Sequence, residues 1–417
     1  MSRARTSVAA VLLLVCGLRV WCQSSPLTIE HAVAEAFDHN LNLLVERFNV
    51  DVADAAILTA SLRPNPVVTG NVMRPDRSLV DAGISPYEEV FRTDYLLERG
   101  GKRERRIDQA SLAKSVAALQ LLNTTRTLRL EVQSAFTDLL LAQRNLSLAQ
   151  QNLKAFNDIV GINTERVRTG DLSAVELSRS RLAALQLQND VRQQQAKLTV
   201  AKNRLSTLLG RGPNGDALDV TGDLRKDPVP VDYEQLRVQA LEARPDIRAL
   251  RAEQARSVAD TRLQLANRAI DYTISGEYHR QEGADVHGNS YGLFFSAPLA
   301  IFNRNQGEVA RAQIQQRQTV TKLRALEQDV ANELANAYTE YSATREIVES
   351  IEAQMLKTAS DVRTATEYSY RRGEASFVEF LDAVRAYNDT MQSYNEARAA
   401  YARSLYALDS IAGKVIP

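Results

Sequence analysis

The chain repeats itself with an offset of 202 to 204 residues, and no other feature constrains its fold as strongly. Residues 168–171 (RTGD) match 371–374 (RRGE), and the pair 209–210 matches the pair 412–413. A chain that carries one unit twice is expected to fold as two similar halves. We place these halves at 23–226 and 227–417, with the Gly/Pro/Asp-rich segment 210–230 as the linker between them.

Each half contains a long block almost free of helix breakers. No proline lies between Pro86 and Pro213 or between Pro298 and Pro417. Apolar residues recur there every seven positions, at Val132, Leu139, Leu146, Leu153 and Val160, and again at Leu334, Tyr341, Val348, Met355 and Val362. A seven-residue period makes packed helices supercoil. The pattern excludes an all-β protein and predicts antiparallel coiled-coil hairpins that reverse near Gly170 and Gly373.

Each half also contains two segments in which apolar and polar residues alternate, as β-strands require. They lie at 68–72, 91–97, 270–278 and 290–296, and we expect loops at 74–86 and 279–289. One apolar, aromatic-rich face is typical of outer-membrane barrels, although a soluble sheet packed on helices gives the same alternation. Four strands cannot close a barrel, and lipid does not tolerate an open edge. A barrel would therefore be shared between copies, most simply three.

The N-terminus has the pattern of a secretory signal, which we place at 1–22. Arg3 and Arg5 precede an apolar run at 8–15, and a polar stretch follows. Cleavage there would remove both cysteines, as expected for an exported protein without disulfides, although lipid attachment at Cys22 stays open. The 51 basic residues equal the 51 acidic ones, which argues against a nucleic-acid binder. No later stretch approaches the roughly 20 apolar residues of a spanning helix.

The two glycine turns lie in sequences that resemble the TolC-like outer membrane efflux protein family. These are RVRTGDLSAVEL at 166–177 and YRRGEASFVEFLD at 370–382, and the resemblance extends over about residues 27–413. It implies a mainly α fold with a small β part. Long antiparallel coiled-coil hairpins would form a periplasmic α-barrel, and four strands per chain would contribute to a trimeric 12-stranded transmembrane β-barrel.

The same resemblance implies a function. The chain would be a passive homotrimeric channel in the bacterial outer membrane, in contact with its lipid and with a large periplasmic extension. Its partners would be a periplasmic adaptor (membrane fusion protein) and an inner-membrane transporter of the resistance-nodulation-division or ABC type. The sequence does not distinguish a drug, a metal ion or a polypeptide as cargo.

The resemblance also assigns site residues. Adaptor docking falls on the turn residues Thr169, Gly170, Asp171, Arg372, Gly373 and Glu374. Glu379 and Asp382 would line the periplasmic constriction, where rings of carboxylates favour cations. Glu176 and Tyr370 take the positions of a latch pair, whereas Ala375 replaces the basic latch residue. A solvated coiled-coil face is the alternative role for the constriction and latch residues.

Other functions find little support. No nucleophile–base pair or carboxylate dyad lies in a plausible cleft, so we predict no enzyme, no cofactor and no metal site. His279 and His287 flank an acidic stretch that we interpret as a polar loop. Two alternatives stay open: a periplasmic coiled-coil adaptor, and a scaffolding coiled coil without a pore. An adaptor would normally have one hairpin flanked by β-rich domains.

Overall fold

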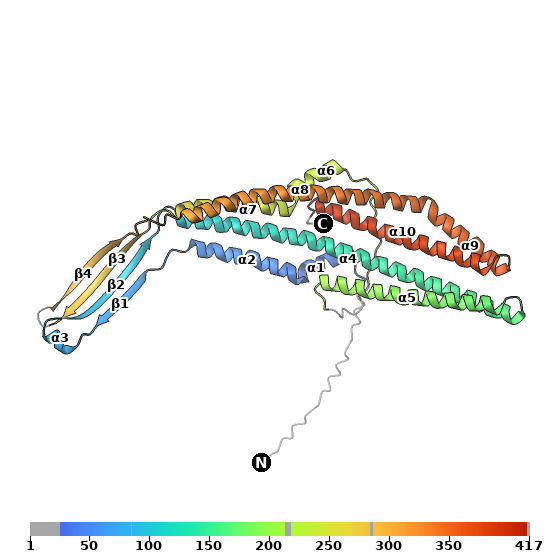
Figure 1. Ribbon diagram of the computed structural model, residues 1–417, viewed down its shortest axis with the longest axis horizontal. Coiled ribbons are helices and arrows are strands. Elements are labelled where there is room, and N and C mark those ends of the chain that lie inside the picture. The colour runs from blue at the N-terminus through green and yellow to red at the C-terminus, as the bar shows by residue number, and fades with distance from the viewer. Residues whose placement is uncertain (1–25, 85, 213–217, 284–286, 415–417) are drawn as a thin grey trace, which may run out of the picture.

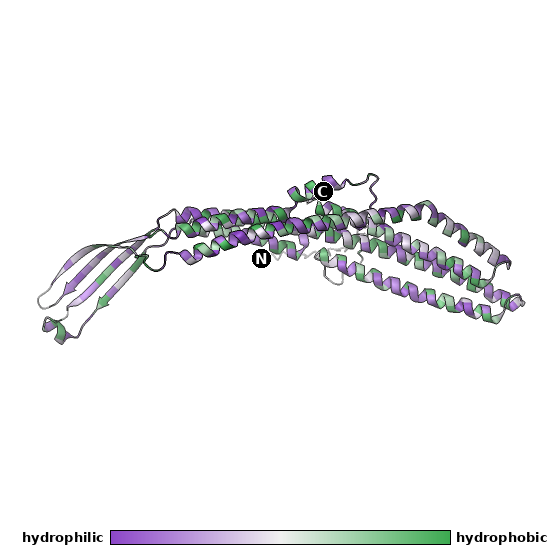
Figure 2. Cartoon of the chain, turned by 45° about the horizontal axis from the view of Figure 1, so that its top comes forward, coloured by the Kyte–Doolittle hydropathy of each residue, from purple (hydrophilic) through white to green (hydrophobic). Residues whose placement is uncertain are grey.

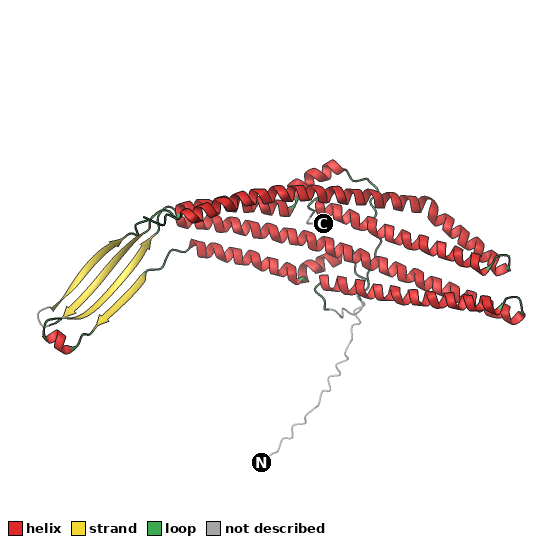
Figure 3. Cartoon of the chain, in the orientation of Figure 1, coloured by secondary structure: helices red, strands yellow, loops and turns green. Residues whose placement is uncertain are grey.

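The computed structural model describes residues 26–84, 86–212, 218–283 and 287–414, so the predicted signal lies outside the described residues. The molecule is elongated, with a four-stranded sheet at one end and long helices along the rest (Figures 1 and 3). Two helical hairpin tips lie at the end farthest from the sheet. Within the described ranges, no helix is both long enough and apolar enough to cross a membrane.

The two halves contain the same order of elements, apart from one short helix between the strands of the first half and one π-helix within the long helix of the second. The first half contains α1 (Ile29–His39), α2 (Leu41–Ser61), β1 (Val67–Met73), the short α3 (Arg77–Asp81), β2 (Tyr87–Leu97), α4 (Lys102–Thr169) and α5 (Ala174–Leu208). The second half contains α6 (Tyr233–Ala243), α7 (Pro245–Ala266), β3 (Tyr272–Glu282), β4 (His287–Ser296), α8 (Gln306–Ser350), the π-helix η1 (Ile351–Met355), α9 (Leu356–Arg372) and α10 (Phe377–Ile411). The predicted hairpins are confirmed, since α4 reverses into α5 at Gly170 and α9 into α10 at Gly373.

The predicted seam of α4 is buried in its first part and then drifts. Val132, Leu139 and Leu146 are buried, whereas Leu153 and Val160 are only half-buried. Their neighbours Asn152 and Ile159 take the buried positions instead. The buried residues Leu146, Ala149 and Asn152 follow one another at two successive spacings of three, which is a three-residue insertion in the heptad pattern. After Ala149 the buried positions therefore lie one residue earlier than a strict seven-residue period predicts.

In the second half the predicted seam is wrong at its last two positions. Val348 is 1% exposed, but Met355 and Val362 are 46% and 48% exposed. The π-helix η1 begins at Ile351, which is still buried, and ends at Met355. A π-helical turn inserts one extra residue into the α-helical register, which rotates the following residues around the helix axis. Figure 1 shows α9 leaving the line of α8 at this point.

The four strands form one antiparallel sheet in the order β1-β2-β3-β4. Registers such as Leu97↔Tyr272 and Tyr278↔Tyr291 assign the side chains to two faces. The apolar face contains Val68, Val72, Phe91, Tyr95, Leu97, Tyr272, Ile274, Tyr278, Tyr291, Leu293 and Phe295. The polar face contains Thr69, Asn71, Arg92, Asp94, Thr273, Ser275, Glu277, His279 and Gln281. Figure 2 shows this mixture of hydrophobic and hydrophilic residues along the strands.

Two predicted loop boundaries are wrong. His279 lies within β3 and pairs with Ser290, so the strands extend into the predicted loop 279–289. The segment 74–86 contains the short helix α3 rather than loop alone. The strand ends were missed because polar residues occupy both faces there, which removes the alternation on which the sequence analysis depended.

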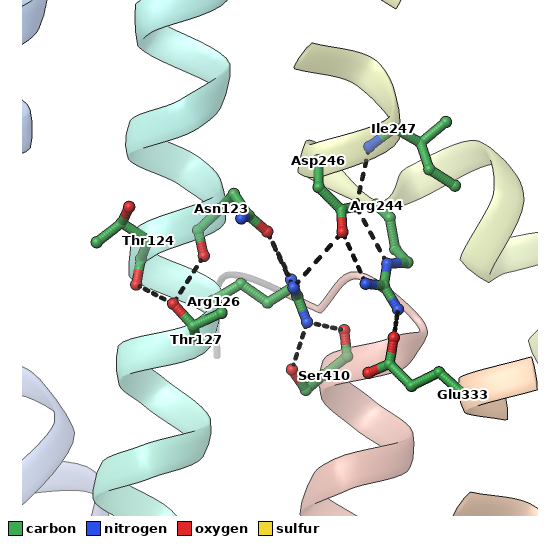
Figure 4. Close-up of polar contacts among 9 residues, drawn as sticks. All are labelled: Asn123, Thr124, Arg126, Thr127, Arg244, Asp246, Ile247, Glu333 and Ser410. Atoms are coloured by element: carbon green, nitrogen blue, oxygen red, sulfur yellow. Dashed lines mark hydrogen bonds and ion pairs between the residues drawn. The ribbon is translucent and has the colours of Figure 1, made fainter. Parts of the chain in front are cut away.

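A buried charged network joins the two halves midway along the helices, at a level that we call the waist (Figure 4). Arg244, at the junction of α6 and α7, lies 2.7 Å from Asp246 and 2.7 Å from Glu333 of α8. Arg126 of α4 donates to the Ser410 hydroxyl of α10 at 2.8 Å and lies 3.8 Å from Asp246. Both guanidiniums are almost fully buried. The network therefore links four helices of both repeats.

Ionisation at the waist follows from burial and pairing. Burial lowers the pKa of Arg126, and the nearby charge of Arg244 lowers it further. Burial alone would raise the pKa of Asp246, but hydrogen bonds from Arg244 and the charges of both guanidiniums hold it below its ordinary value. The carboxylate of Asp246 thus stays charged at neutral pH.

Candidate functional site at the two hairpin tips

The two tip turns have the same backbone. Gly170 ends α4 with φ 85°, and Gly373 ends α9 with φ 82°, a left-handed conformation that glycine adopts without strain. The following amides then bond back to the helix: Asp171 N to Arg166 O at 2.8 Å, and Glu374 N to Ser369 O at 2.9 Å. The six predicted docking residues are therefore arranged alike in both tips, at one end of the molecule.

The surroundings of the two glycines differ. A Cβ atom on Gly170 would have no heavy atom within 4 Å, whereas one on Gly373 would lie 3.3 Å from a guanidinium nitrogen of Arg166. Arg166 belongs to the first tip and extends to the second, where its Nη1 lies 3.5 Å from the carbonyl oxygen of Tyr370. The first tip is thus open to solvent, and the second is partly covered by the first.

The helices that leave the tips begin with serine caps. Ser173 accepts from the amide of Glu176 at 3.2 Å, and Ser376 accepts from the amide of Glu379 at 3.3 Å. Only the second tip forms a full capping box, because the Glu379 carboxylate accepts from the Ser376 amide at 2.7 Å. This backbone hydrogen bond, with one from the serine hydroxyl, lowers the pKa of Glu379. Asp382, one turn further along α10, is exposed.

The predicted latch residue Tyr370 is buried and bonds to a different partner. Its side chain is 2% exposed, and its hydroxyl donates to Asn163 Oδ1 of α4 at 2.8 Å. Burial raises the pKa of Tyr370. Within the described chain no hydrogen bond joins it to Glu176, which is half-exposed. The structure thus connects the second hairpin to the first through Asn163.

An aromatic cluster surrounds this hydrogen bond. The ring of Tyr370 stacks on Phe380 with centroids 5.1 Å apart, and Phe380 stacks on Phe156 of α4 at 5.9 Å. Phe377 completes the cluster against Phe156 at 6.2 Å. Rings from three helices of both hairpins therefore pack together directly behind the tips.

Sequence reasoning missed Asn163 and Arg166. Asn163 follows Phe156 by seven residues, in the buried stripe of α4, so a polar residue at a core position was the available signal. Its side chain is fully buried, and its Nδ2 has no hydrogen-bond partner in the described structure. Arg166 stands within the repeated motif, but nothing in the sequence showed that it crosses to the other tip.

Farther from the tips, a cavity of about 260 Å³ lies between α4, α5 and α10. Its lining is rich in carboxamides, including Asn152, Gln194 and Asn388. Gln194 is 5% exposed, and among the described residues neither its Oε1 nor Asn388 Oδ1 has a hydrogen-bond partner. The contact between the hairpins is thus loosely packed and polar below the aromatic cluster.

Comparison with known proteins shows where this architecture occurs. The family model described as "Outer membrane efflux protein" matches residues 32–211 and 236–414. The cobalt-zinc-cadmium resistance protein CzcC of Cupriavidus metallidurans is 26% identical over 363 residues, which cover 87% of this chain and 84% of that protein. The cation efflux system protein CusC of Escherichia coli K12 is 28% identical over 282 residues, 64% of this chain and 60% of that protein.

Solved structures have the same fold. The outer-membrane channel OprN aligns with a TM-score of 0.77 at 20% identity, over 92% of this chain and 89% of that one. The open state of the Neisseria gonorrhoeae MtrE outer membrane channel aligns with a TM-score of 0.75 at 17% identity, over 92% and 88%. The strands and hairpins described above are thus arranged as in these channels.

Proposed function

The chain belongs to the outer membrane efflux protein family and is an outer membrane channel of a tripartite efflux system, and we propose that it works as a homotrimer. The observation that supports this assembly is the four-stranded sheet with one apolar face and two unpaired edges, β1 and β4. Lipid does not tolerate open edges, and twelve strands from three copies close a barrel. The order of the strands makes β4 of one copy antiparallel to β1 of the next.

The edge helix α2 supports the same assembly. Leu41, Val45, Phe48 and Val52 follow a three-four spacing, and each is between 56% and 71% exposed in the single chain. An exposed apolar seam at this spacing is suited to packing against another helix. A second copy beside this edge would bury it.

Light scattering in mild detergent tests the trimer. We expect the parent to have the mass of three chains. Val52→Lys places a charge in the seam, and this variant should have a mass below that of the trimer. Asp51→Lys is the matched control, because it changes the neighbouring exposed position and should leave the trimer intact. A monomeric parent contradicts the proposal.

We further propose that the tips dock a periplasmic adaptor through Thr169, Gly170, Asp171, Arg372, Gly373 and Glu374. The left-handed glycines allow another hairpin to approach the backbone closely. Gly170→Val and Gly373→Val should block cross-linking to the adaptor and export while the trimer persists. Gly161→Val is the control, because a Cβ there would have no heavy atom within 4 Å and the residue lies within α4. Unchanged cross-linking in both tip variants would exclude this docking mode.

Glu379 and Asp382 are proposed to line the narrowest part of the channel. Three copies would place six carboxylates there, and rings of carboxylates favour cations. The double variant Glu379→Gln and Asp382→Asn should weaken cation preference and divalent block in single-channel recordings. The same recordings on Glu176→Gln test whether this residue contributes to the gate. If the double variant has the same ion selectivity as the parent, Glu379 and Asp382 do not line the lumen.

For the cargo we propose divalent metal cations, because two relatives carry the names of a cobalt-zinc-cadmium resistance protein and a cation efflux system protein. The inner-membrane transporter would then be of the resistance-nodulation-division type. Deletion of the gene should lower growth tolerance to cobalt, zinc or cadmium and leave antibiotic tolerance unchanged. If the deletion lowers antibiotic tolerance but not metal tolerance, the channel exports drugs instead of metal cations.

A further inference from the structure

Aromatic side chains gather at the helical end of the sheet, on its apolar face. Tyr95, Tyr272 and Phe295 lie near the ends of β2, β3 and β4, where the strands join the helices (Figure 1). Tyr272 and Phe295 are in contact, with ring centroids 5.0 Å apart. Aromatic belts of this kind lie at the membrane–water interface of outer-membrane barrels. Because the helices extend into the periplasm, this belt lies at the level of the inner leaflet.

The segments next to this belt are strongly basic. We call the segments 61–66, 98–108, 266–271 and 297–305 the collar; they contain eight basic and four acidic residues. The basic residues are Arg63, Arg99, Lys102, Arg103, Arg105, Arg106, Arg268 and Arg304. At the opposite end of the sheet, the segment 74–84 contains two basic and two acidic residues. The excess of positive charge is thus confined to the helical end.

Most acidic residues of the collar are paired within it. Lys102 lies 2.6 Å from Asp271, Arg106 lies 2.5 Å from Glu98, and Arg105 lies 3.6 Å from Asp108. Only Glu104 has no ion pair in the described structure. By the same criterion, no carboxylate pairs with the collar residues Arg63, Arg99 and Arg103, so their charges are available to an external anion.

Arg99 is held rigidly at the edge of the aromatic belt. Its backbone amide donates to Asp271 at 2.8 Å, and its guanidinium lies 4.5 Å from the centroid of the Tyr272 ring. The next residue, Gly100, has φ 75°, and a Cβ there would lie 2.7 Å from the side chain of Ala269. Arg99 follows Leu97, the last residue of β2, and its contact with the Tyr272 ring places the guanidinium beside the apolar face of the sheet, the face expected to contact lipid.

Arg63 and Arg103 line a cavity of about 280 Å³ beside the same strand. Tyr95 and Leu97 form its apolar part. Nε of Arg103 donates to the carbonyl oxygen of Ser61 at 2.6 Å, which fixes the guanidinium near Arg63. Glu98, Lys102 and Glu104 also line the cavity, but Glu98 is paired with Arg106 and Lys102 with Asp271. Within the described structure, the cavity therefore combines two guanidiniums without a carboxylate partner, one unpaired carboxylate and an apolar wall.

We propose that Arg63, Arg99 and Arg103 bind the phosphate groups of anionic phospholipids in the inner leaflet of the outer membrane. Guanidinium groups bind phosphate oxygens in a bidentate manner, and basic residues at a membrane surface attract anionic lipids. The apolar wall would contact the first carbons of the acyl chains, which a free phosphate ion lacks. Because β2 and β3 are the central strands, a neighbouring copy that pairs at β1 and β4 leaves Arg99 uncovered. The proposal rests on the membrane barrel described above.

Spin-labelled lipids test this site in proteoliposomes of phosphatidylcholine. The measured quantity is the ratio in which the full-length protein immobilises labelled phosphatidylglycerol over labelled phosphatidylcholine. We expect about a twofold preference for phosphatidylglycerol in the parent, averaged over all boundary lipids. The triple variant Arg63→Gln, Arg99→Gln and Arg103→Gln should show no preference. The control is the triple variant Arg74→Gln, Arg77→Gln and Arg280→Gln. It removes the same number of positive charges at the opposite end of the sheet and should keep the preference for phosphatidylglycerol.

Several outcomes would overturn the proposal. The first is that the parent immobilises both lipids equally. The second is that the control triple variant loses the preference for phosphatidylglycerol as fully as the collar variant does. The third is that soluble glycerol phosphate competes fully, which would indicate a site for free anions. Light scattering on each variant separates these results from the channel function. A trimer without lipid preference overturns only the headgroup site, whereas a monomer in the parent overturns the assembly itself.

Discussion

The waist and the tips join the same two halves of the molecule by different interactions. At the waist, Arg244 and Arg126 bind carboxylates and hydroxyls from three other helices within a buried network. Behind the tips, one hydrogen bond between Tyr370 and Asn163 lies among stacked rings, and the neighbouring cavity contains carboxamide atoms without partners. Unpaired buried polar groups reduce stability, whereas a satisfied charged network resists separation.

This difference indicates where the two hairpins can separate. A conformational change that parts the tips would break few hydrogen bonds and leave no buried charge without a partner, and its main cost would be exposure of the aromatic cluster. The same movement at the waist would leave buried guanidiniums without their carboxylates. We therefore expect the hairpins to pivot about the waist, and the following predictions test the contrast from the largest effect to the smallest.

The largest effect is expected for Arg244→Ala. The change leaves the largely buried carboxylate of Asp246 without its main partner, a loss that typically costs about 3–5 kcal/mol of unfolding free energy, and also removes the partner of the half-exposed Glu333. Urea unfolding followed by circular dichroism measures it. Arg237→Ala is the control, because Arg237 is half-exposed and pairs only with Glu234, and it should cost less than about 1 kcal/mol. Equal effects of the two changes would contradict a central role for the waist.

Acid should weaken the waist through Asp246. The pKa of Asp246 is lower in the folded protein than in the unfolded chain, so its contribution to stability is complete above the unfolded value, about 3.9. That contribution is lost as the pH falls below 3.9 and through the folded pKa. Asp246→Asn should flatten this part of the stability profile below about pH 4. A variant with the parent's acid profile would show that other groups control the transition.

A smaller loss is expected for Tyr370→Phe. It removes one hydrogen bond and leaves Asn163 Oδ1 unpaired in the core, which costs about 1–2 kcal/mol. The double variant Tyr370→Phe and Asn163→Leu should recover part of this loss, because replacing both partners by apolar groups removes the unpaired atoms. A double variant less stable than Tyr370→Phe would mean that the asparagine has a further role at this contact.

Sequence reasoning predicted the hairpins, the four strands and the tip turns, because each depends on local periodicity or on a glycine with a left-handed backbone. It failed at Met355 and Val362, where a π-helix rotates the seam, and no residue in that segment marks the insertion. It also did not predict the hydrogen bond between Tyr370 and Asn163. The contact with Asn163 depends on how two helices 200 residues apart in the sequence pack, which local patterns do not determine.

The smallest effect distinguishes the two tips from each other. Glu379 and Glu176 occupy the same position of the repeat, but only the Glu379 carboxylate bonds back to its own cap, at Ser376. Glu379→Ala should therefore increase fraying of the first turn of α10, whereas Glu176→Ala should change α5 less. Capping interactions contribute about 0.5–2 kcal/mol, and this half of a capping box is expected at the lower end. Amide hydrogen exchange at the first turns of both helices measures the difference. Equal acceleration in both variants would mean that Glu176 also forms the reciprocal bond in solution, which would make the two tips equivalent in their caps as well as in their backbones.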